Sequence, residues 1–145
     1  MDKPTKLEQQ LCFEVYKASS NFSKLYAKTL EPFGLTFTQY LVLLVLWEED
    51  GLTMKEIGGQ LGLGTGTLNP ILNRMIQNGR IVKEQSAEDR RAFRISLTEQ
   101  SRADEKPIEQ AIYDKITSCN YLDVNAIELM KNLKSLNAFF GEMDL

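Results

Sequence analysis

The sequence predicts a mainly α-helical fold with one small β-hairpin, and three observations lead to this fold class. Apolar residues recur at spacings of three and four over most of the 145 residues, which is the period of amphipathic helices. A polar-faced helix that ends at Asn78-Gly79 follows a glycine turn. Two short alternating segments, residues 81–85 and 92–97, then enclose an arginine-bearing turn. A helix pair followed by such a hairpin is a winged helix-turn-helix.

The N-terminal region is predicted to form one long helix. Thr5 followed by Glu8 fits a capping box, and Pro32 with Gly34 ends the helix. Between them one apolar stripe recurs at helical spacing: Leu11, Val15, Ala18, Phe22 and Leu25. Cys12 lies beside this stripe, about two turns inside the predicted helix.

Two more capping boxes predict the next two helices. Thr36 with Gln39 opens a helix over about residues 37–49, which is apolar nearly all round and therefore expected to be buried. Thr53 with Glu56 opens a short helix that a glycine ends.

The following helix is predicted to begin near residues 65–67. Thr65 is expected to cap it, because Gly64 has no side chain for that purpose. Pro70 is compatible with this helix if it lies in or near the first turn, where N–H groups lack an intrahelical partner. The outward side chains are expected to be Thr65, Thr67, Asn69, Asn73 and Arg74, and the inward ones Leu68, Ile71, Leu72, Met75 and Ile76.

The hairpin turn carries a small arginine cluster. Arg90 and Arg91 lie in the turn, and Arg94 follows in the second strand. Asp89 is expected to hold the Arg91 guanidinium through a forked salt bridge. Such a tip is suited to the narrow, electronegative minor groove of A·T-rich DNA.

Two helices are predicted after the hairpin. Thr98 caps the first, which runs to about Ser118 and is expected to kink or break at Pro107. Asp123 is expected to cap the second. The outer helices carry more apolar surface than one small domain covers, so a homodimer is expected. The expected division is residues 1–34 for an N-terminal dimerisation and sensor helix, 35–98 for the DNA-binding domain, and 99–145 for C-terminal dimerisation helices.

Composition excludes several function classes. The chain has no histidine, and its two cysteines lie 107 residues apart without a CxxC pair, so no catalytic pair, metal site or cofactor is expected. We therefore expect no enzyme. The longest apolar run, from Tyr40 to Trp47, is too short for a membrane span, and a cytoplasmic protein is expected.

The formal net charge is −3, but basic residues gather in one segment. Residues 74–94 hold six basic side chains (Arg74, Arg80, Lys83, Arg90, Arg91, Arg94) against three acidic ones (Glu84, Glu88, Asp89). A basic patch on an acidic body directs phosphate contact to one face. Thr and Asn bond base edges or phosphates, and arginine bonds phosphate or guanine. The segment therefore predicts binding to double-stranded DNA, with a dimer reading a pseudo-palindromic operator.

The helix Gly-Thr-Leu-x-Pro-x-Leu-x-Arg-Met at residues 66–75 and the Asp-x-Arg wing at residues 89–91 resemble the MarR family of regulators over essentially the whole chain. Gln10-Leu-Cys-Phe-x-x-Tyr16 and Leu35-Thr-Phe-Thr-Gln-Tyr40 resemble its organic-hydroperoxide and thiol-oxidation sensing repressors. The resemblance implies a triangular homodimer joined by its terminal helices. It places Thr65, Thr67, Asn69, Pro70 and Arg74 near the major groove, and Asp89 with Arg91 at the minor groove.

The same resemblance implies a redox input. Related sensors hydrogen-bond the N-terminal cysteine with tyrosines of the partner subunit, which corresponds here to Tyr26 and to position 37, where this chain has Phe37. Tyr16 lies one turn after Cys12 on the same face. Family members with a second C-terminal cysteine form an intersubunit disulfide, which assigns Cys119 as the resolving thiol. Organic hydroperoxide is then the effector.

From the residues alone, other interpretations stay open. Cys12 and Cys119 also fit small core residues. The chain would then be a regulator controlled by a small apolar or phenolic ligand in the dimer cleft, with both cysteines inert. A thiol peroxidase is disfavoured, since no cationic residue lies near Cys12.

Overall fold

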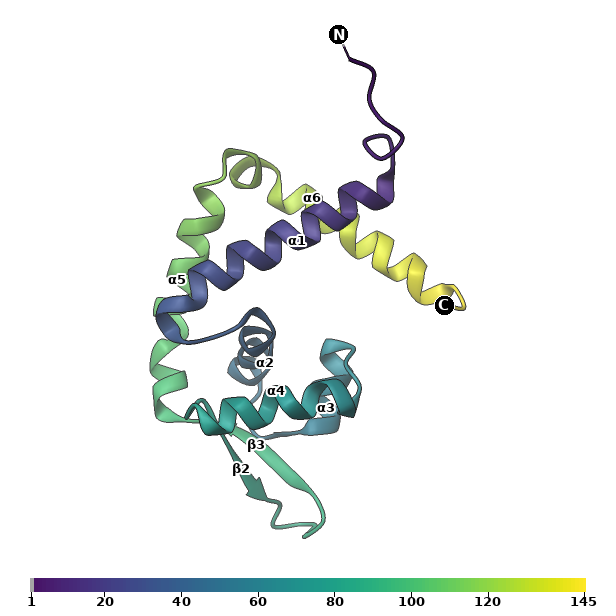
Figure 1. Cartoon of the computed structure of the whole chain (residues 1–145). Coiled ribbons are helices and arrows are strands. Elements are labelled where there is room, and N and C mark those ends of the chain that lie inside the picture. Colours follow the sequence, from purple (N-terminus) through teal and green to yellow (C-terminus); the bar gives the residue numbers. More distant parts are fainter. Residues whose placement is uncertain (1) are drawn as a thin grey trace. The chain divides into compact units, whose positions relative to one another are not determined.

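The computed structural model describes residues 2–145, and the predicted order of elements is confirmed (Figure 1). The elements are α1 (Leu11–Leu30), η1 (Glu31–Phe33), α2 (Phe37–Glu48), β1 (Leu52–Thr53), α3 (Met54–Leu61), α4 (Thr65–Gln77), β2 (Ile81–Gln85), β3 (Phe93–Leu97), α5 (Glu99–Thr117) and α6 (Asn120–Glu142). The chain forms two compact units. The first ends at Glu109 and the second comprises Gln110–Leu145.

The core of the first unit forms around α2. This helix is buried along most of its length, as its nearly uniform apolar sequence predicts. The fully buried apolar side chains come from α2 itself and from all other elements of this unit except η1 and β1. They are Leu30, Val42, Leu43, Leu46, Ile57, Leu68, Met75, Ile81, Ile95 and Ile108. The core therefore supports α4 and the hairpin from behind.

Both capping boxes of the helix-turn-helix region are confirmed. The Thr36 hydroxyl accepts from the Gln39 N–H and the Gln39 side chain accepts from the Thr36 N–H. Thr53 and Glu56 make the same reciprocal pair at the start of α3. These bonds satisfy N–H groups that have no partner inside a helix, so they fix where α2 and α3 begin.

The third predicted capping box forms only in part and does not start the long helix. The Glu8 N–H does donate to the Thr5 hydroxyl at 3.1 Å, but this closes only a separate turn. Gln10 adopts an extended backbone (φ −96°, ψ 127°) that separates the turn from α1. The prediction for the helix start was therefore wrong, and Cys12 is the second residue of α1 rather than two turns inside it.

The sheet has one more strand than the sequence predicted. β2 and β3 form the antiparallel hairpin, and β1 pairs with the other edge of β3, giving the order β1-β3-β2. Leu52 of β1 lies opposite Ile95, and both side chains are buried. β1 has only two residues, too few for an alternating pattern, so its pairing depends on the neighbouring β3.

α5 begins as predicted but does not break at its proline. The Ser101 N–H donates to the Thr98 hydroxyl at 3.3 Å, which confirms Thr98 as the cap. The helix then continues through Pro107 to Thr117, so a break at this proline does not occur. The division between the two compact units falls inside α5, two residues after this proline.

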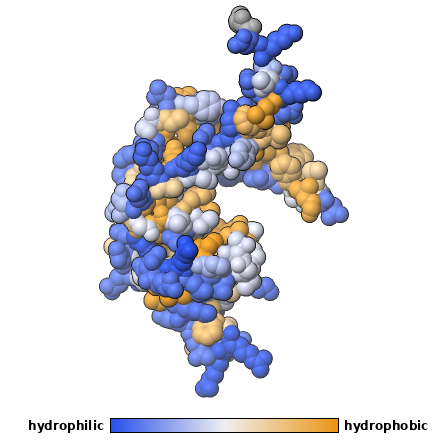
Figure 2. Space-filling view, viewed as in Figure 1, coloured by the Kyte–Doolittle hydropathy of each residue, from blue (hydrophilic) through white to orange (hydrophobic). Residues whose placement is uncertain are grey.

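The second unit contains α6, which starts earlier than predicted. Cys119, and not Asp123, is the residue before the first helical position, and the Asp123 N–H donates to the Cys119 carbonyl at 2.9 Å. Figure 2 shows apolar side chains gathered over α6. The exposed ones are Tyr121, Val124, Ile127, Met130, Leu133, Leu136, Phe139 and Phe140.

Within residues 2–145, no single helix combines the length and hydropathy of a membrane span. Only α1 with η1 and the following α2 reach those values as a pair, and the two segments are bent by 72°.

Candidate nucleic-acid interface and thiol sites

α4 presents the polar face that its sequence predicts. The inward residues Leu68, Leu72 and Met75 are buried. The opposite face exposes the candidate DNA-binding residues Thr65, Thr67, Asn69, Pro70, Asn73 and Arg74. Because the inward residues anchor α4 in the core, the exposed row is held by a rigid element and not by a loop.

The first turn of α4 differs from the prediction. Gly64 precedes the helix, and its carbonyl accepts from the N–H groups of Thr67 and Leu68 at 3.2 and 3.0 Å. Thr65 is already helical and caps nothing, so that prediction was wrong. Pro70 is the sixth helical residue and lies in the second turn, where it leaves the Gly66 carbonyl without its usual N–H donor.

Close packing of α3 on the turn before α4 depends on Gly58. The Leu63 N–H donates to the Gly58 carbonyl at 2.9 Å, and a Cβ at Gly58 would lie 2.6 Å from the Leu63 carbonyl oxygen. Gly62 between them has φ of +70°, the left-handed conformation that glycine adopts without strain. These two glycines set the direction in which the chain enters α4.

Short hydrogen bonds shape the wing turn. The Ser86 N–H donates to the Ala92 carbonyl at 2.9 Å, and the Gln85 side chain donates to the Arg90 carbonyl at 2.6 Å. The Asp89 carboxylate accepts from the backbone N–H of Arg91 at 3.0 Å. No Asp89–Arg91 ion pair occurs among residues 2–145, so the predicted forked salt bridge was wrong. Asp89 instead fixes the Arg91 backbone and leaves its guanidinium exposed.

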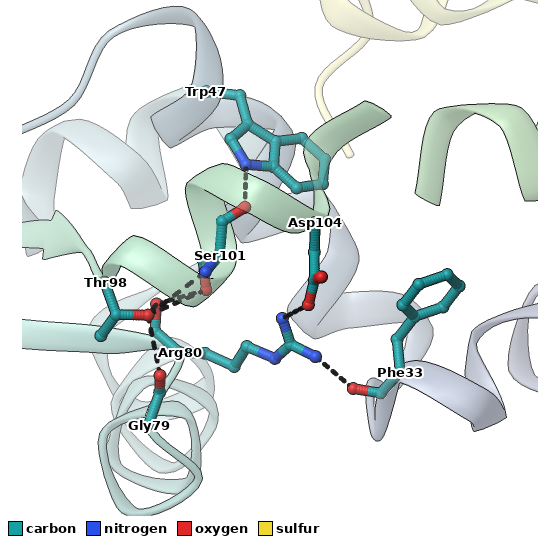
Figure 3. A network of polar contacts seen from close by, with 7 residues as sticks. All are labelled: Phe33, Trp47, Gly79, Arg80, Thr98, Ser101 and Asp104. Atoms are coloured by element: carbon teal, nitrogen blue, oxygen red, sulfur yellow. Dashed lines mark hydrogen bonds and ion pairs between the residues drawn. The ribbon is translucent and has the colours of Figure 1, made fainter. Parts of the chain in front are cut away.

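Two of the six basic residues counted in this segment point into the fold. Arg94 is half-buried within β3, and its guanidinium donates to the Gly51 carbonyl at 2.8 Å. Arg80 is 5% exposed and forms an ion pair with Asp104 at 2.7 Å (Figure 3). The cations that remain on the surface are Arg74, Lys83, Arg90 and Arg91.

Residues from α4 and from the wing line one shared hollow. A cavity of about 220 Å³ is lined by Asn69 and Asn73 of α4, Lys83 of β2 and Arg91 of the wing. The other flank of α4 forms a shallow hollow with Thr38 of α2 and with Thr36 directly before it, next to Arg74. The fold therefore brings together the α4 and Arg91 candidates, and sequence analysis missed Lys83, Thr36 and Thr38 as their neighbours.

The two thiols occupy comparable places in different units. Cys12 is exposed in the first turn of α1, and Cys119 is half-buried directly before α6. Both are reduced. Tyr16, one turn after Cys12, is exposed as well.

Tyr26 and Phe37 belong to an aromatic cluster. Their ring centroids are 4.8 Å apart, and Tyr40 packs on Tyr26 at 5.8 Å and on Trp47 at 6.2 Å. Burial raises the pKa of Tyr26, and burial followed by the neighbouring Tyr26 and Glu109 raises the pKa of Tyr40. Tyr26 follows Cys12 by 14 residues, about 21 Å along α1, so the two do not meet within one protomer.

The geometry just described defines a winged helix-turn-helix regulator, and comparisons with known proteins agree. Residues 24–108 match the family described as transcriptional regulator SarA/Rot. An organic hydroperoxide resistance transcriptional regulator of Bacillus subtilis is 50% identical over 94 residues, 65% of this chain and 64% of that relative. The chain thus matches less than two thirds of that protein. MgrA of Staphylococcus aureus is 35% identical over 92% of both chains.

Solved structures of AbfR, a protein of Staphylococcus epidermidis, are also similar. Reduced AbfR bound to DNA is 39% identical, with 90% of this chain and 95% of that chain covered and a TM-score of 0.70. Disulfide-formed AbfR is 37% identical, with 92% and 93% covered and a TM-score of 0.67. The chain belongs to the SarA/Rot family of transcriptional regulators. Its fold is similar to that of a MarR transcriptional regulator from Methanosarcina mazei, with a TM-score of 0.76 at 20% identity.

Proposed function

We propose that the protein is a transcriptional repressor that binds double-stranded DNA through α4 and the wing. The supporting observation is the shared hollow, where Asn69 and Asn73 of α4 stand next to Arg91 of the wing. α4 then enters the major groove, and Arg90 with Arg91 reach the adjacent minor groove. The curated relatives named above are transcriptional regulators. The structure of one similar protein, reduced AbfR, was solved in complex with DNA.

The binding species is a homodimer. Ile127 and Val124 are 73% and 81% exposed in one protomer, and Leu11 of α1 is 80% exposed. Binding of a second copy of the chain would remove these exposed apolar side chains from water, which stabilises a dimer. Two-fold symmetry then presents two α4 helices to half-sites about 34 Å apart, so the operator is pseudo-palindromic.

Oxidation of Cys12 releases the DNA. The Cys12 thiolate attacks the outer oxygen of an organic hydroperoxide and the O–O bond breaks, which yields a sulfenic acid and an alkoxide that takes a proton from water to become the alcohol. The thiolate of a second copy's Cys119 then attacks that sulfur, forming a disulfide and displacing hydroxide. The bond requires Cα atoms within about 7 Å, so it constrains the dimer. A displacement of a few ångströms between the α4 helices is enough to lose one half-site.

The experiment combines a non-reducing gel with a DNA-mobility assay, before and after cumene hydroperoxide. Oxidation should produce a dimer-sized band and abolish the shifted DNA complex. Cys12→Ser should bind DNA and ignore the oxidant. Cys119→Ser should lose the dimer-sized band. Unchanged mobility and affinity in the oxidised wild type would reject the redox mechanism and leave a small-ligand effector as the next hypothesis.

A further inference from the structure

Arg80 lies at the junction between α4 and β2, in the three-residue connection that ends directly before Ile81. It is the most deeply buried charged side chain among residues 2–145, with 5% of its surface exposed. A basic residue in this position is unnecessary for the hairpin itself, since Ile81 and Leu97 already close the sheet at this end. The placement of Arg80 therefore calls for another explanation.

The Arg80 side chain joins two other elements (Figure 3). One guanidinium nitrogen donates to the Asp104 carboxylate of α5 at 2.7 Å. The other donates to the carbonyl of Phe33 in η1, the short segment that directly follows α1. Arginine holds its donors in a planar fork, so both bonds together fix the direction of the side chain.

The Arg80 backbone is bound to the same helix. Its carbonyl accepts from the Ser101 hydroxyl at 2.7 Å and from the Thr98 N–H at 3.2 Å. Ser101 is fully buried, and its own carbonyl accepts from the Trp47 indole of α2 at 3.0 Å. The junction that carries α4 and the wing is thus connected to η1, α5 and α2 by directional polar bonds.

Stability alone does not explain a buried ion pair at this place. Replacing a buried ion pair by apolar side chains of similar volume is often neutral or stabilising. Directional bonds supply what apolar contacts do not, which is one defined orientation of the joined elements. This favours a positioning role for the Arg80–Asp104 pair.

We propose that Arg80 is a positioning residue that locks the α4–wing junction to the end of α1 and to α5, and so fixes the spacing of half-sites that the protein accepts. This inference rests on the proposed function, because it assumes that α1 contributes to a DNA-binding dimer. If α4 can turn relative to α1, duplexes with altered spacing become acceptable. Arg80 thereby determines the specificity for operator geometry and not for individual bases.

The test uses duplexes that the full-length wild type selects from a random-sequence pool under reducing conditions. One base pair is then inserted or deleted between the half-sites. Wild-type affinity should fall at least tenfold for either change. The double variant Arg80→Leu/Asp104→Leu should lose less than threefold, while Arg80→Lys, which keeps the charge but not the fork, should fall between them.

Arg102→Gln is the matched control. It removes another ion pair of α5, at 3.0 Å to Asp50, whose partners are 55% and 33% exposed. This variant should discriminate spacing as the wild type does. If the double variant also discriminates as sharply as the wild type, the inference is overturned. If the wild type selects no duplex at all, the proposed DNA-binding function fails instead.

A DNA-independent measurement covers the case in which the double variant does not fold. Spin labels at Lys28 of α1 and Asn73 of α4, both exposed, report the distance between these helices within one protomer. Cys12→Ser and Cys119→Ser provide the cysteine-free background, and an excess of unlabelled protein suppresses distances between subunits. The distance distribution should broaden in Arg80→Lys and stay unchanged in Arg102→Gln. Equal widths in both would contradict the inference.

Discussion

Gly58→Ala tests the packing that delivers the chain into α4. Alanine is the better helix former by about 1 kcal/mol, which on its own would stabilise α3. Its Cβ, however, would lie 2.6 Å from the Leu63 carbonyl oxygen, and this oxygen belongs to backbone and cannot rotate away. Displacing packed backbone costs about 1–3 kcal/mol. Taking the gain from the cost, we expect a net loss of up to about 2 kcal/mol in the free energy of unfolding.

Gly59→Ala is the matched control, because it makes the same change one residue later in the same helix. A Cβ at Gly59 meets nothing within 4 Å, so this variant should gain about 0.5–1 kcal/mol. Urea unfolding followed by circular dichroism measures both. For a chain of this size each kcal/mol corresponds to roughly 2–4 °C in Tm. A Gly58→Ala protein as stable as Gly59→Ala would refute the reasoning about this contact.

Three further predictions concern the wing, the aromatic cluster and the dimer. Arg91→Ala should weaken DNA binding about tenfold and make the salt dependence shallower, whereas Lys106→Ala on α5 should change neither in a fluorescence-anisotropy titration. Burial raises the folded-state pKa of Tyr26, so Tyr26 keeps its proton to a higher pH in the folded state than in the unfolded state, and the free energy of unfolding should fall as pH rises above about 10. In denaturant titrations Tyr26→Phe should reduce that fall. The same change at the exposed Tyr113 should leave it unaltered. Ile127→Glu should convert the dimer to a monomer in light scattering, and an unaltered dimer would exclude this face of α6 from the interface.

The sequence was most informative where a local signal determines the structure. The Thr36 and Thr53 capping boxes gave the starts of α2 and α3, because their bonds join residues only three positions apart. The alternation in the hairpin gave β2 and β3 to within one residue. The inward residues of α4 followed from helical period, since tertiary packing and local pattern agree there.

The predictions were wrong where a tertiary contact or a single backbone angle determines the structure. The extended backbone of Gln10 separates the Thr5 turn from α1, and the pattern of apolar residues does not report that angle. The partners of Arg80 lie 24 and 47 residues away, so counting charge along the chain treated a buried cation as part of a surface patch. The hydrogen bond of Arg94 could not be predicted for the same reason, because its acceptor Gly51 is 43 residues away.

The surroundings of the Cys12 thiol could not be predicted from local sequence patterns. Tyr26 and Phe37 meet each other, but Cys12 lies at the far end of α1 from Tyr26. A sensor built from these residues requires a second copy of the chain. The sequence pattern can propose that arrangement through its resemblance to related regulators, but one protomer does not contain it.

The most direct measurement is a titration of the selected duplex with reduced protein, monitored by fluorescence anisotropy at several salt concentrations and paired with light scattering of the complex. We predict two protomers per duplex and an affinity that falls steeply as salt rises, because surface arginines and lysines displace condensed counterions. A complex with one protomer, or an affinity insensitive to salt, would contradict DNA binding by paired α4 helices and wings.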